Sequence, residues 1–377
     1  MSSDPINFSV VIPLYNKGPH VERAILSVLE QDHPAAEIIV VDDGSTDGGL
    51  EIVRGFKGVK VLRRPVPGPG GYAARNLGIV AASTEWIAFL DADDRWRPDH
   101  LSTLAAAIAK NDGQVGCAFT RPTFVTDGTT RPYPISKVIR TSTKPLDLHG
   151  FVAAWLHAKT CPMWTGAVAV RRSVLLAAGM FPANAATRGG DKDVWLRVMA
   201  RTNGIFVPKV TAEFHQDTVN RVTKSLDHTV QPIICRSIAR LLQSARPGTQ
   251  SLLKRLHNME VVYYARYAAG AGAPFNRDSL NSLCAPALRS TVKIMSFAMA
   301  GSVLRLLRSP RFKPAAFNAR VAAEPVPATS PSVCDPASSR ATTVRPSRAE
   351  APRAWIGVAA RSVPERRETD LPVRLSA

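Results

Sequence analysis

The first hundred residues alternate between short apolar runs and amphipathic stretches. The apolar runs are rich in β-branched residues and predict buried strands over 8–13, 37–41, 59–62 and 86–90. Between these runs, apolar residues recur at helical spacing and predict helices over 18–31, from Tyr72 onward, and over 101–109. Strands that alternate with helices indicate an α/β fold, with a mostly parallel sheet that carries helices on both faces.

After residue 115 this regular alternation ends. Short strands and turns are predicted over 115–140, a strand over 165–170, and helices over 149–158, 172–178 and 190–201. Past 230 the pattern is helical, and from 309 Pro, Ala, Arg and Ser dominate without periodicity. The expected organisation is an α/β domain, a helical C-terminal region and a disordered tail, over 1–229, 230–308 and 309–377.

The charge of the chain is distributed unevenly. The 48 basic and 30 acidic side chains give a formal net charge of +18 over 377 residues. Residues 230–377 hold 22 of the basic and 8 of the acidic side chains, a net of +14, which leaves +4 for residues 1–229. Because the first domain is nearly balanced, the basicity is no argument for nucleic-acid binding there, and no nucleic-acid partner is expected.

The cysteines and the apolar segments indicate the cellular compartment in which the protein is expected. The five cysteines are widely spaced and form no C-x-x-C pair, which argues against a zinc ribbon and favours a reducing cytosol. The opening MSSDPINFS lacks the pattern of a signal peptide. The most apolar stretch, 291–307, contains Lys293 and Arg305 and predicts either a core helix or a helix on a membrane surface. We expect a cytoplasmic protein, with peripheral association at the inner face of the membrane as an option.

Three carboxylates follow the strand predicted at 86–90. Asp91, Asp93 and Asp94 repel one another unless a cation sits among them, and oxygen ligands at this density suit Mg²⁺ or Mn²⁺. An isolated D-x-D is usually a polar loop that caps the next helix. The position after a fully apolar strand, beside other carboxylate-bearing strand ends, favours the cation site.

Two more segments carry polar groups at the same predicted edge. Asp42 and Asp43 end the second strand, where a carboxylate can accept a hydrogen bond from a nucleobase, although a turn alone explains the residues that follow them. The Gly-rich loop 67–71 precedes Arg75, which can pair with a phosphate or a carboxylate. Taken alone, this loop is weak evidence.

The last candidates lie further along the chain. Asp191 and Asp193 begin a helix, where acids usually complement the helix dipole but can also serve as a general base toward an alcohol. These two readings stand about even. His215 is a lone histidine, a residue that is more often structural than a ligand.

Together these segments resemble the family-2 glycosyltransferases, whose nucleotide-sugar-binding domain has the GT-A (Rossmann-like) fold. The resemblance covers roughly residues 8–220 and rests on six segments in the family's order: VVIPLYN (10–16), IIVVDDGSTD (38–47), ARNLGI (74–79), WIAFLDADD (86–94), TGAVAVRR (165–172) and GGDKDVWLR (189–197).

The resemblance implies roles for the donor-binding residues. Tyr15, which follows Pro13 in the first loop, would stack near the nucleobase. Asp43 would accept a hydrogen bond from that base, and Asp42 would support the turn. Arg75 would lie close to the ribose or the diphosphate.

It also implies a metal site and a base. Asp91 and Asp93 match the D-x-D motif, with Asp93 preferred as the direct ligand of Mg²⁺ or Mn²⁺, and His215 falls where many members place a histidine near the diphosphate or the metal. Asp191 matches the aspartate that deprotonates the acceptor hydroxyl. The glutamate that usually precedes this aspartate is Gly190 here, so either Asp193 or a neighbour takes over its supporting role, or the acceptor geometry differs.

The activity implied is transfer of a sugar, with inversion, from a UDP- or dTDP-linked donor to a hydroxyl of a glycan or lipid-linked acceptor in cell-envelope synthesis. The alternative is a non-catalytic nucleotide-sugar or polyanion-binding protein. The basic helices over 230–308 either lie on an anionic membrane surface or complete the acceptor site.

Overall fold

The computed structural model describes residues 5–111, 113–137, 144–183, 185–186, 188–219, 232–272, 277–285 and 287–308. All of them belong to one compact unit, Met1–Ala316. The predicted disordered tail over 309–377 lies outside the described residues.

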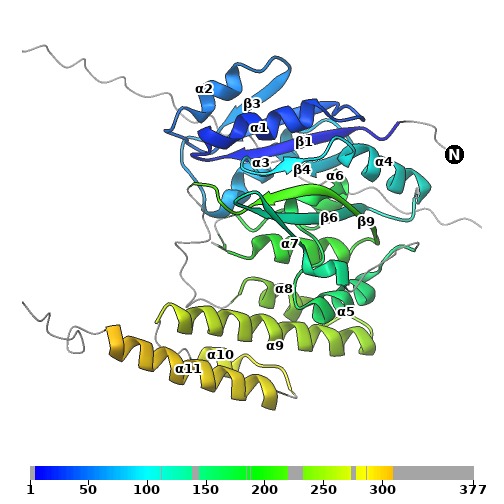
Figure 1. The fold of residues 1–377 in the computed structure, drawn as a ribbon. Helices are drawn as coiled ribbons and strands as arrows, with labels where there is room; N and C mark the ends of the chain where they lie inside the picture. The colour runs from blue at the N-terminus through cyan, green and yellow to red at the C-terminus, as the bar shows by residue number, and fades with distance from the viewer. Residues whose placement is uncertain are drawn as a thin grey trace, which may run out of the picture. The chain divides into compact units, whose positions relative to one another are not determined.

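The first half of the sheet is parallel, as the strand–helix alternation predicts. The strands β1 (Phe8–Leu14), β2 (Glu37–Asp42), β3 (Val59–Arg63) and β4 (Trp86–Phe89) pair in the order β3-β2-β1-β4, all in the same direction (Figure 1). Strand β1 is therefore central, with β2 on one side and β4 on the other. The carboxyl ends of these strands lie along one edge of the sheet.

The second half of the sheet is mixed. Strand β8 (Val168–Arg171) pairs antiparallel with both β4 and β6 (Cys117–Thr126), and β6 runs parallel to β9 (Gly204–His215). Two short strands, β5 (Arg95–Trp96) and β7 (Thr129–Pro132), pair with β9 and β6. The stretch 115–140 contains a short strand, β7, and a turn at Pro134–Lys137, as expected, but its first strand, β6, is ten residues long. The sequence pattern did not predict β9.

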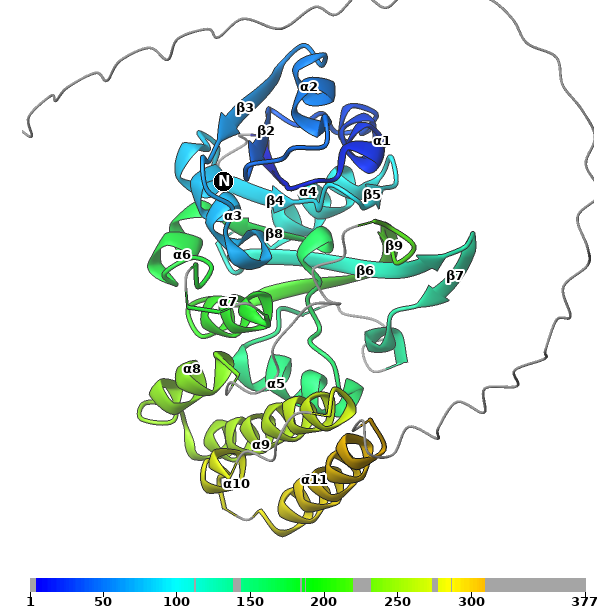
Figure 2. The same cartoon turned by 90° about the vertical axis from the view of Figure 1, so that its left-hand side faces the viewer.

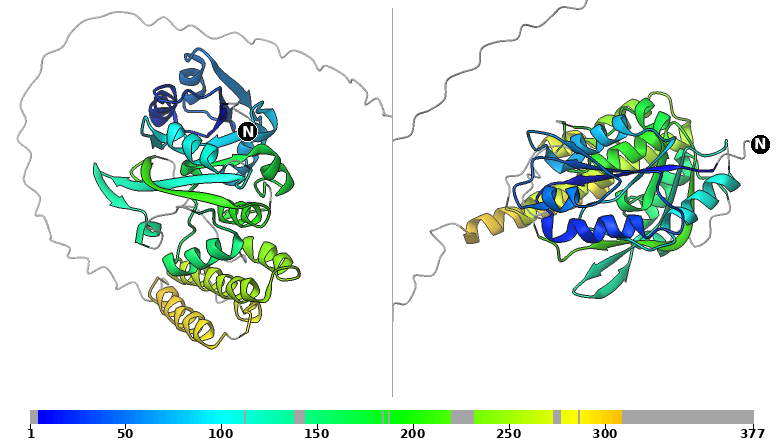
Figure 3. Two further views of the ribbon diagram at one scale, coloured as in Figure 1. Left: turned by 90° about the vertical axis from the view of Figure 1, so that its right-hand side faces the viewer. Right: turned by 90° about the horizontal axis from the view of Figure 1, so that it is seen from above.

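Helices cover both faces of the sheet. One face carries α1 (Gly18–Leu29), α2 (Gly49–Arg54) and α4 (His100–Lys110), and the other carries α3 (Tyr72–Ala81), α6 (Arg172–Ala177) and α7 (Gly190–Met199). Figure 3 shows the ribbon from two further sides, with helices on both faces of the sheet. Alternate residues of β1 contribute to the two apolar layers, since Val10 and Ile12 belong to the first core and Val11 to the second. A Cβ at Gly78 would lie 2.4 Å from Val11, so this glycine lets α3 approach β1 closely.

The remaining helices pack beyond α7. They are α5 (Leu148–Ala158), α8 (Ile234–Leu241), α9 (Pro247–Gly270), α10 (Asp278–Asn281) and α11 (Leu288–Arg308), with 3₁₀ turns at Pro69–Gly71, Pro134–Lys137 and Thr165–Ala167 (Figure 2). Ile238 and Leu256 share one apolar core with Val194 of α7. The helical region thus extends the core of the α/β domain, and the boundary predicted at 229 falls among residues that the structure does not describe. In the described part of the chain, no helix combines the length and hydropathy that crossing a bilayer requires.

A buried aromatic pair supports the loop that follows β4. The rings of Trp96 in β5 and His100 in α4 stack with centroids 4.3 Å apart, and Trp96 Nε1 donates a hydrogen bond to the Gly166 carbonyl at 2.7 Å. His100 Nδ1 lies 2.7 Å from the Thr211 hydroxyl. Burial lowers the pKa of His100 to about 3.

This buried histidine predicts a loss of stability in mild acid. The unfolded chain takes up a proton near pH 6.5 and the folded protein does so only near pH 3, so His100 destabilises the fold as pH falls through 6.5 toward 3. Between pH 7 and pH 5 the contribution is about 2 kcal/mol. Urea unfolding at both pH values should show this additional loss in the wild type and not in His100→Gln; equal losses in both proteins would contradict it.

Candidate functional site

The polar residues predicted to share an edge follow three neighbouring strands. In the register of the sheet, Leu14 of β1 lies opposite Asp42 of β2, and Val11 lies opposite Phe89 of β4. Because the strands are parallel and adjacent, the loops that follow them leave the sheet side by side. The acidic residues after β2 and β4 therefore flank the loop after β1.

Asp42 and Asp43 are both buried at the end of β2. Asp42 Oδ1 accepts a hydrogen bond from the Ser45 N–H at 3.0 Å and so holds the turn. Asp43 Oδ2 accepts one from the Gly68 N–H at 3.0 Å, and its other oxygen pairs with Arg64. Burial raises the pKa of the Asp43 carboxyl, while Gly68 and Arg64 act in the opposite direction. The contact between Asp43 and a nucleobase stays a prediction.

The first loop presents an exposed aromatic ring. The side chain of Tyr15 is 44% exposed. The adjacent Asn16 accepts a hydrogen bond from the Thr46 N–H at 2.8 Å, which ties the loop after β1 to the loop after β2. A Cβ at Gly71 would lie 3.5 Å from Pro13 Cβ, so the Gly-rich loop also passes close to β1. The structure places Tyr15 where three loops meet, and its stacking role stays a prediction.

Arg75 joins α3 to the end of β4. Its guanidinium pairs with the Asp91 carboxylate, donates a hydrogen bond to the Gly70 carbonyl at 2.9 Å and lies 5.5 Å from the centre of the Phe181 ring. The side chain of Arg75 is only 9% exposed. The guanidinium of Arg75 is therefore fixed beside residues 91–94, called the acidic loop below, where an anionic ligand can contact it.

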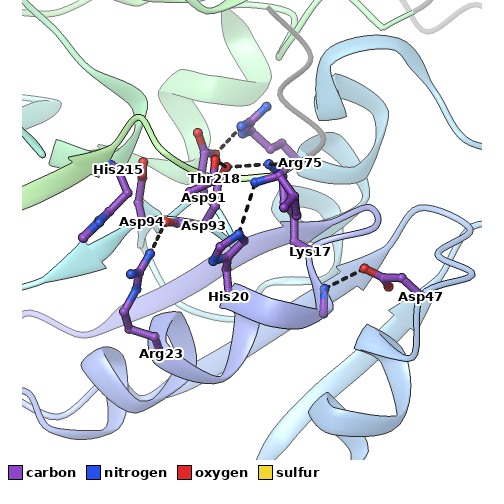
Figure 4. A network of polar contacts seen from close by, with 12 residues as sticks. Lys17, His20, Arg23, Asp47, Arg75, Asp91, Asp93, Asp94, His215 and Thr218 are labelled. Atoms are coloured by element: carbon purple, nitrogen blue, oxygen red, sulfur yellow. Dashed lines mark hydrogen bonds and ion pairs between the residues drawn. The ribbon is translucent and has the colours of Figure 1, made fainter. Parts of the chain in front are cut away.

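Asp93 is engaged by several neighbours (Figure 4). Its Oδ2 accepts hydrogen bonds from Lys17 Nζ at 2.6 Å and from the Thr218 hydroxyl at 2.8 Å. Lys17 Nζ also donates to the Val219 carbonyl at 2.6 Å, and Arg23 donates to the Asp93 carbonyl at 2.6 Å. The acidic loop is thus tied both to α1 and to the segment that follows β9.

Asp94 and His215 are held together through the backbone. Asp94 Oδ1 accepts a hydrogen bond from the His215 N–H at 3.0 Å. Asp94 Oδ2 is buried and has no hydrogen-bond partner among the described residues. Burial, together with the negative charges of Asp93 and Asp91, raises the pKa of Asp94 well above its ordinary value. The His215 ring lies 3.7 Å from Glu213, longer than a hydrogen bond, so its place in a metal site stays a prediction.

The three carboxylates after β4 are of the chemical type that binds a divalent cation. Asp91, Asp93 and Asp94 offer the hard oxygen ligands that Mg²⁺ and Mn²⁺ prefer. Two of these carboxylates already hold a cationic side chain, and the third keeps an unpartnered buried oxygen, so the loop attracts positive charge. Within the described ranges, no three acidic, histidine or cysteine side chains are arranged to hold a metal ion. Lys17 and Arg75 occupy oxygens of Asp93 and Asp91, so a cation at this loop would compete with them for these oxygens, and the metal site stays a prediction.

Asp191 lies at the start of α7, next to α3. The Gly190 N–H donates a hydrogen bond to the Tyr72 hydroxyl at 2.9 Å, which ties the two helices together. Burial and the nearby charge of Asp191 both raise the pKa of Tyr72, and the same charge acts on Arg75. In the part of the chain that the structure describes, no group donates a hydrogen bond to the Asp191 carboxylate. Asp191 therefore lies near enough to Tyr72 and Arg75 for its charge to act on both, and its role as the base stays a prediction.

The glycine that replaces the expected glutamate fills a tight space. A Cβ at Gly190 would lie 2.7 Å from Pro182 Cγ and 2.7 Å from Tyr72 Cζ. The Tyr72 ring is itself fixed by stacking on Phe181, with centroids 6.1 Å apart. Position 190 cannot carry a longer side chain while Tyr72 keeps this place.

Asp193, two residues after Asp191, has a structural role. It is buried and forms an ion pair with Arg197 at 2.7 Å, and it accepts a hydrogen bond from the Ser237 hydroxyl of α8 at 2.6 Å. Arg197 in turn donates to the Met180 carbonyl at 2.8 Å. These contacts occupy Asp193 inside the fold, so Asp191 is the carboxylate of this helix that remains for chemistry.

Sequence reasoning missed four residues that shape this site. Lys17, Arg64, Tyr72 and Thr218 lie in loops or at helix starts, where a lone polar residue is usually a surface residue. The available signal was position, since Lys17 directly follows the VVIPLYN segment and Tyr72 directly follows the Gly-rich loop. Thr218 gave no signal, because the strand that carries it to the site was not predicted.

Comparison with known proteins agrees with the resemblance read from the motifs. Residues 9–176 match the family model "Glycosyl transferase family 2", and the chain belongs to this family. It is 38% identical over 96 residues to the putative teichuronic acid biosynthesis glycosyltransferase TuaG of Bacillus subtilis, a match that covers 25% of this chain and 38% of TuaG. The chain spans a similar share, 34% and 36%, of two other glycosyltransferase relatives.

Two further matches extend beyond the family model. An uncharacterised protein of Mycobacterium tuberculosis, MT1568, is 32% identical over 235 residues, which cover 59% of this chain and 69% of that protein. The fold is similar to residues 1–349 of TarS from S. aureus, solved in complex with UDP-GlcNAc, with a TM-score of 0.59 and 16% identity over 80% of this chain and 92% of that one. The expected GT-A fold is thereby confirmed.

The link between Tyr72 and Gly190 predicts a measurable cost. Tyr72→Phe leaves the buried Gly190 N–H without its acceptor, so the free energy of unfolding should fall by about 1–3 kcal/mol. Urea denaturation measures the loss, and hydrogen exchange at Gly190 should accelerate. Tyr15→Phe, which removes a hydroxyl from an exposed ring, serves as the control and should keep wild-type stability. Equal stability of Tyr72→Phe and the control would disprove the link.

Proposed function

We propose that this protein is an inverting glycosyltransferase that uses a nucleotide-diphosphate sugar as donor. The supporting observation is a continuous set of contacts along one sheet edge. It runs from Asp43 through the Gly-rich loop to Arg75, from Arg75 to Asp91, and from the helix of Arg75 through Tyr72 to the helix of Asp191. Asp43, Arg75 and Asp191, which are suited to a nucleobase, a diphosphate and an acceptor hydroxyl respectively, are therefore linked through neighbouring elements.

Donor binding is assigned to the loops after β1 and β2. Asp43 accepts a hydrogen bond from the nucleobase, and the exposed ring of Tyr15 stacks on it. Arg75 sits on the first turns of α3 and pairs with the diphosphate or the neighbouring ribose. A uridine or thymidine base, whose ring N–H is a donor, suits the carboxylate of Asp43.

The acidic loop and α7 divide the chemistry between them. Asp93 and Asp91 would hold a divalent cation, which would stabilise the charge that develops on the leaving diphosphate. Asp191 removes the proton of the acceptor hydroxyl as that oxygen attacks the anomeric carbon from the face opposite the leaving group. This displacement forms the new glycosidic bond while the bond to the diphosphate breaks, and it needs no covalent sugar–enzyme intermediate. The product is inverted at the anomeric carbon.

Replacing the base tests the assignment. Asp191→Asn keeps the size of the side chain but cannot accept the proton, so transfer should fall by about 10²–10⁴-fold while donor affinity stays near the wild-type value. The measurement is sugar transfer from a panel of UDP-, dTDP- and GDP-sugars with Mn²⁺ or Mg²⁺, together with calorimetric donor binding. Full turnover by Asp191→Asn would overturn the assignment.

A neighbouring carboxylate provides the matched control. Asp193→Asn weakens the buried contacts to Arg197 and Ser237, so it should lower stability and leave transfer per folded molecule nearly unchanged. Absence of turnover by the wild type with every donor and metal would instead favour a non-catalytic nucleotide-sugar or polyanion-binding protein.

We further propose that the protein works at an anionic membrane surface on the cytoplasmic side, on a lipid-linked or cell-envelope glycan acceptor. Helix α11 packs on α9 through Gly301, where a Cβ would lie 3.1 Å from Ala269. Its outer face carries an exposed apolar stripe at helical spacing: Leu288, Val292, Met295, Met299 and Val303. The charged residues of this helix are all basic. An apolar stripe with basic flanks is suited to an anionic lipid surface.

The proposal of an envelope glycan as the acceptor has a different support. The chain is similar to TuaG, whose name assigns that protein to teichuronic acid biosynthesis.

Vesicle binding tests the membrane proposal. Co-sedimentation with phosphatidylglycerol-containing vesicles should exceed that with pure phosphatidylcholine vesicles. Serine at Val292, Met295 and Met299 together should weaken binding about tenfold or more, because each exposed apolar side chain loses its burial in lipid. A control triple variant with serine at Leu29, Val66 and Val80, which are exposed elsewhere, should bind like the wild type. Binding that is independent of anionic lipid would exclude this role.

A further inference from the structure

Lys17 occupies an unusual place for a lysine. It is the residue before the first turn of α1, and its side chain is only 11% exposed. Its ammonium lies 2.6 Å from Asp93 Oδ2 and 2.6 Å from the Val219 carbonyl oxygen. A lysine ammonium is strongly hydrated and is rarely buried unless it is paired, so these contacts replace the water that Lys17 gives up.

The contacts of Lys17 resemble those of a cation bound in the acidic loop. The ammonium meets a carboxylate oxygen and a carbonyl oxygen, which are the oxygen types that a hard divalent cation also uses. The Thr218 hydroxyl donates to the same Asp93 oxygen at 2.8 Å, so this oxygen is fully engaged (Figure 4). Three other lysines, Lys60, Lys192 and Lys209, pair instead with Glu37, Glu260 and Asp99.

We propose that Lys17 is a built-in counter-ion that competes with the divalent cation for Asp93. This inference rests on the proposed function, because it assumes that the acidic loop takes a cation together with the donor. In the ligand-free protein the ammonium neutralises Asp93 and limits the repulsion among the three neighbouring carboxylates. A divalent cation gains Asp93 Oδ2 only by displacing this ammonium, so Lys17 lowers the affinity of the loop for the cation.

Metal affinity without nucleotide tests the competition. Lys17→Met removes the competing ammonium and keeps an unbranched side chain of similar length. The expected result is an Mn²⁺ affinity about tenfold or more above that of the wild type, measured by isothermal calorimetry on the ligand-free protein, because a charge-assisted hydrogen bond no longer has to be broken.

Arg23 provides a control for charge alone. It donates to the backbone carbonyl of Asp93 and not to the carboxylate, so Arg23→Met removes a nearby positive charge without removing a competitor. Its Mn²⁺ affinity should rise less than about threefold. An equal rise in both variants, or no rise in Lys17→Met, would overturn the proposal.

A measurement on the wild type needs no variant and covers the case in which Lys17→Met does not fold. Mn²⁺ should free the ammonium, so the labelling of Lys17 by an amine-reactive reagent, read by mass spectrometry, should increase when Mn²⁺ is added. Lys209, paired with Asp99 away from the acidic loop, should label at the same rate with and without Mn²⁺. Unchanged labelling of Lys17 in the presence of bound Mn²⁺ would contradict the displacement.

These outcomes separate the two proposals. Sugar transfer by the wild type combined with an unchanged Mn²⁺ affinity in Lys17→Met would refute the competition and leave the glycosyltransferase assignment standing. A tighter Mn²⁺ complex in Lys17→Met without any transfer by the wild type would support the competition and refute the assignment of activity.

Discussion

The architecture depends on bringing like charges together at one edge of a parallel sheet. Because β1 is paired with β2 on one side and β4 on the other, two acidic strand ends meet around a single loop. Repulsion among these carboxylates has to be offset, and the structure offsets it with cations from separate elements. The ion pairs are Asp42 with Arg63, Asp43 with Arg64, Asp91 with Arg75, and Asp93 with Lys17. Each of these acids therefore has a cationic side chain beside it in the ligand-free protein.

The one departure from the family pattern has a steric explanation. Where a glutamate is expected, Gly190 leaves room for the Tyr72 ring, and the Tyr72 hydroxyl accepts the hydrogen bond of the Gly190 amide. In place of a glutamate side chain at position 190, the structure has a direct contact between α3 and α7. The backbone at the start of α7, one residue before Asp191, is thereby held by Tyr72 from α3 without a glutamate at position 190.

The sequence predicted the first half of the fold well, since apolar strands and helical periodicity are local signals. Strand β9 was missed because Pro208 and Lys209 interrupt its pattern, and its pairing with β6 shifts register between Thr120 and Pro122. The motif residues were located by their positions at strand ends. The partner of Asp93 was not predictable, because Lys17 is 76 residues away in the chain and only the folded sheet brings the two together.

The helical region that sequence alone left open as a separate part is built into the site. Three residues at the start of α7 tie it to three other helices: the Gly190 N–H bonds to Tyr72 of α3, while Lys192 pairs with the buried Glu260 of α9 at 2.9 Å and Asp193 bonds to Ser237 of α8. Only Asp191 lies between them without such a contact among the described residues. Helix α7, which carries the predicted base, is thus fixed by α3 at its first residue and by α8 and α9 in its first turn. Because several independent contacts hold this turn, the loss of one of them costs stability without moving the whole helix, and the helical region is part of the structure that supports the candidate site.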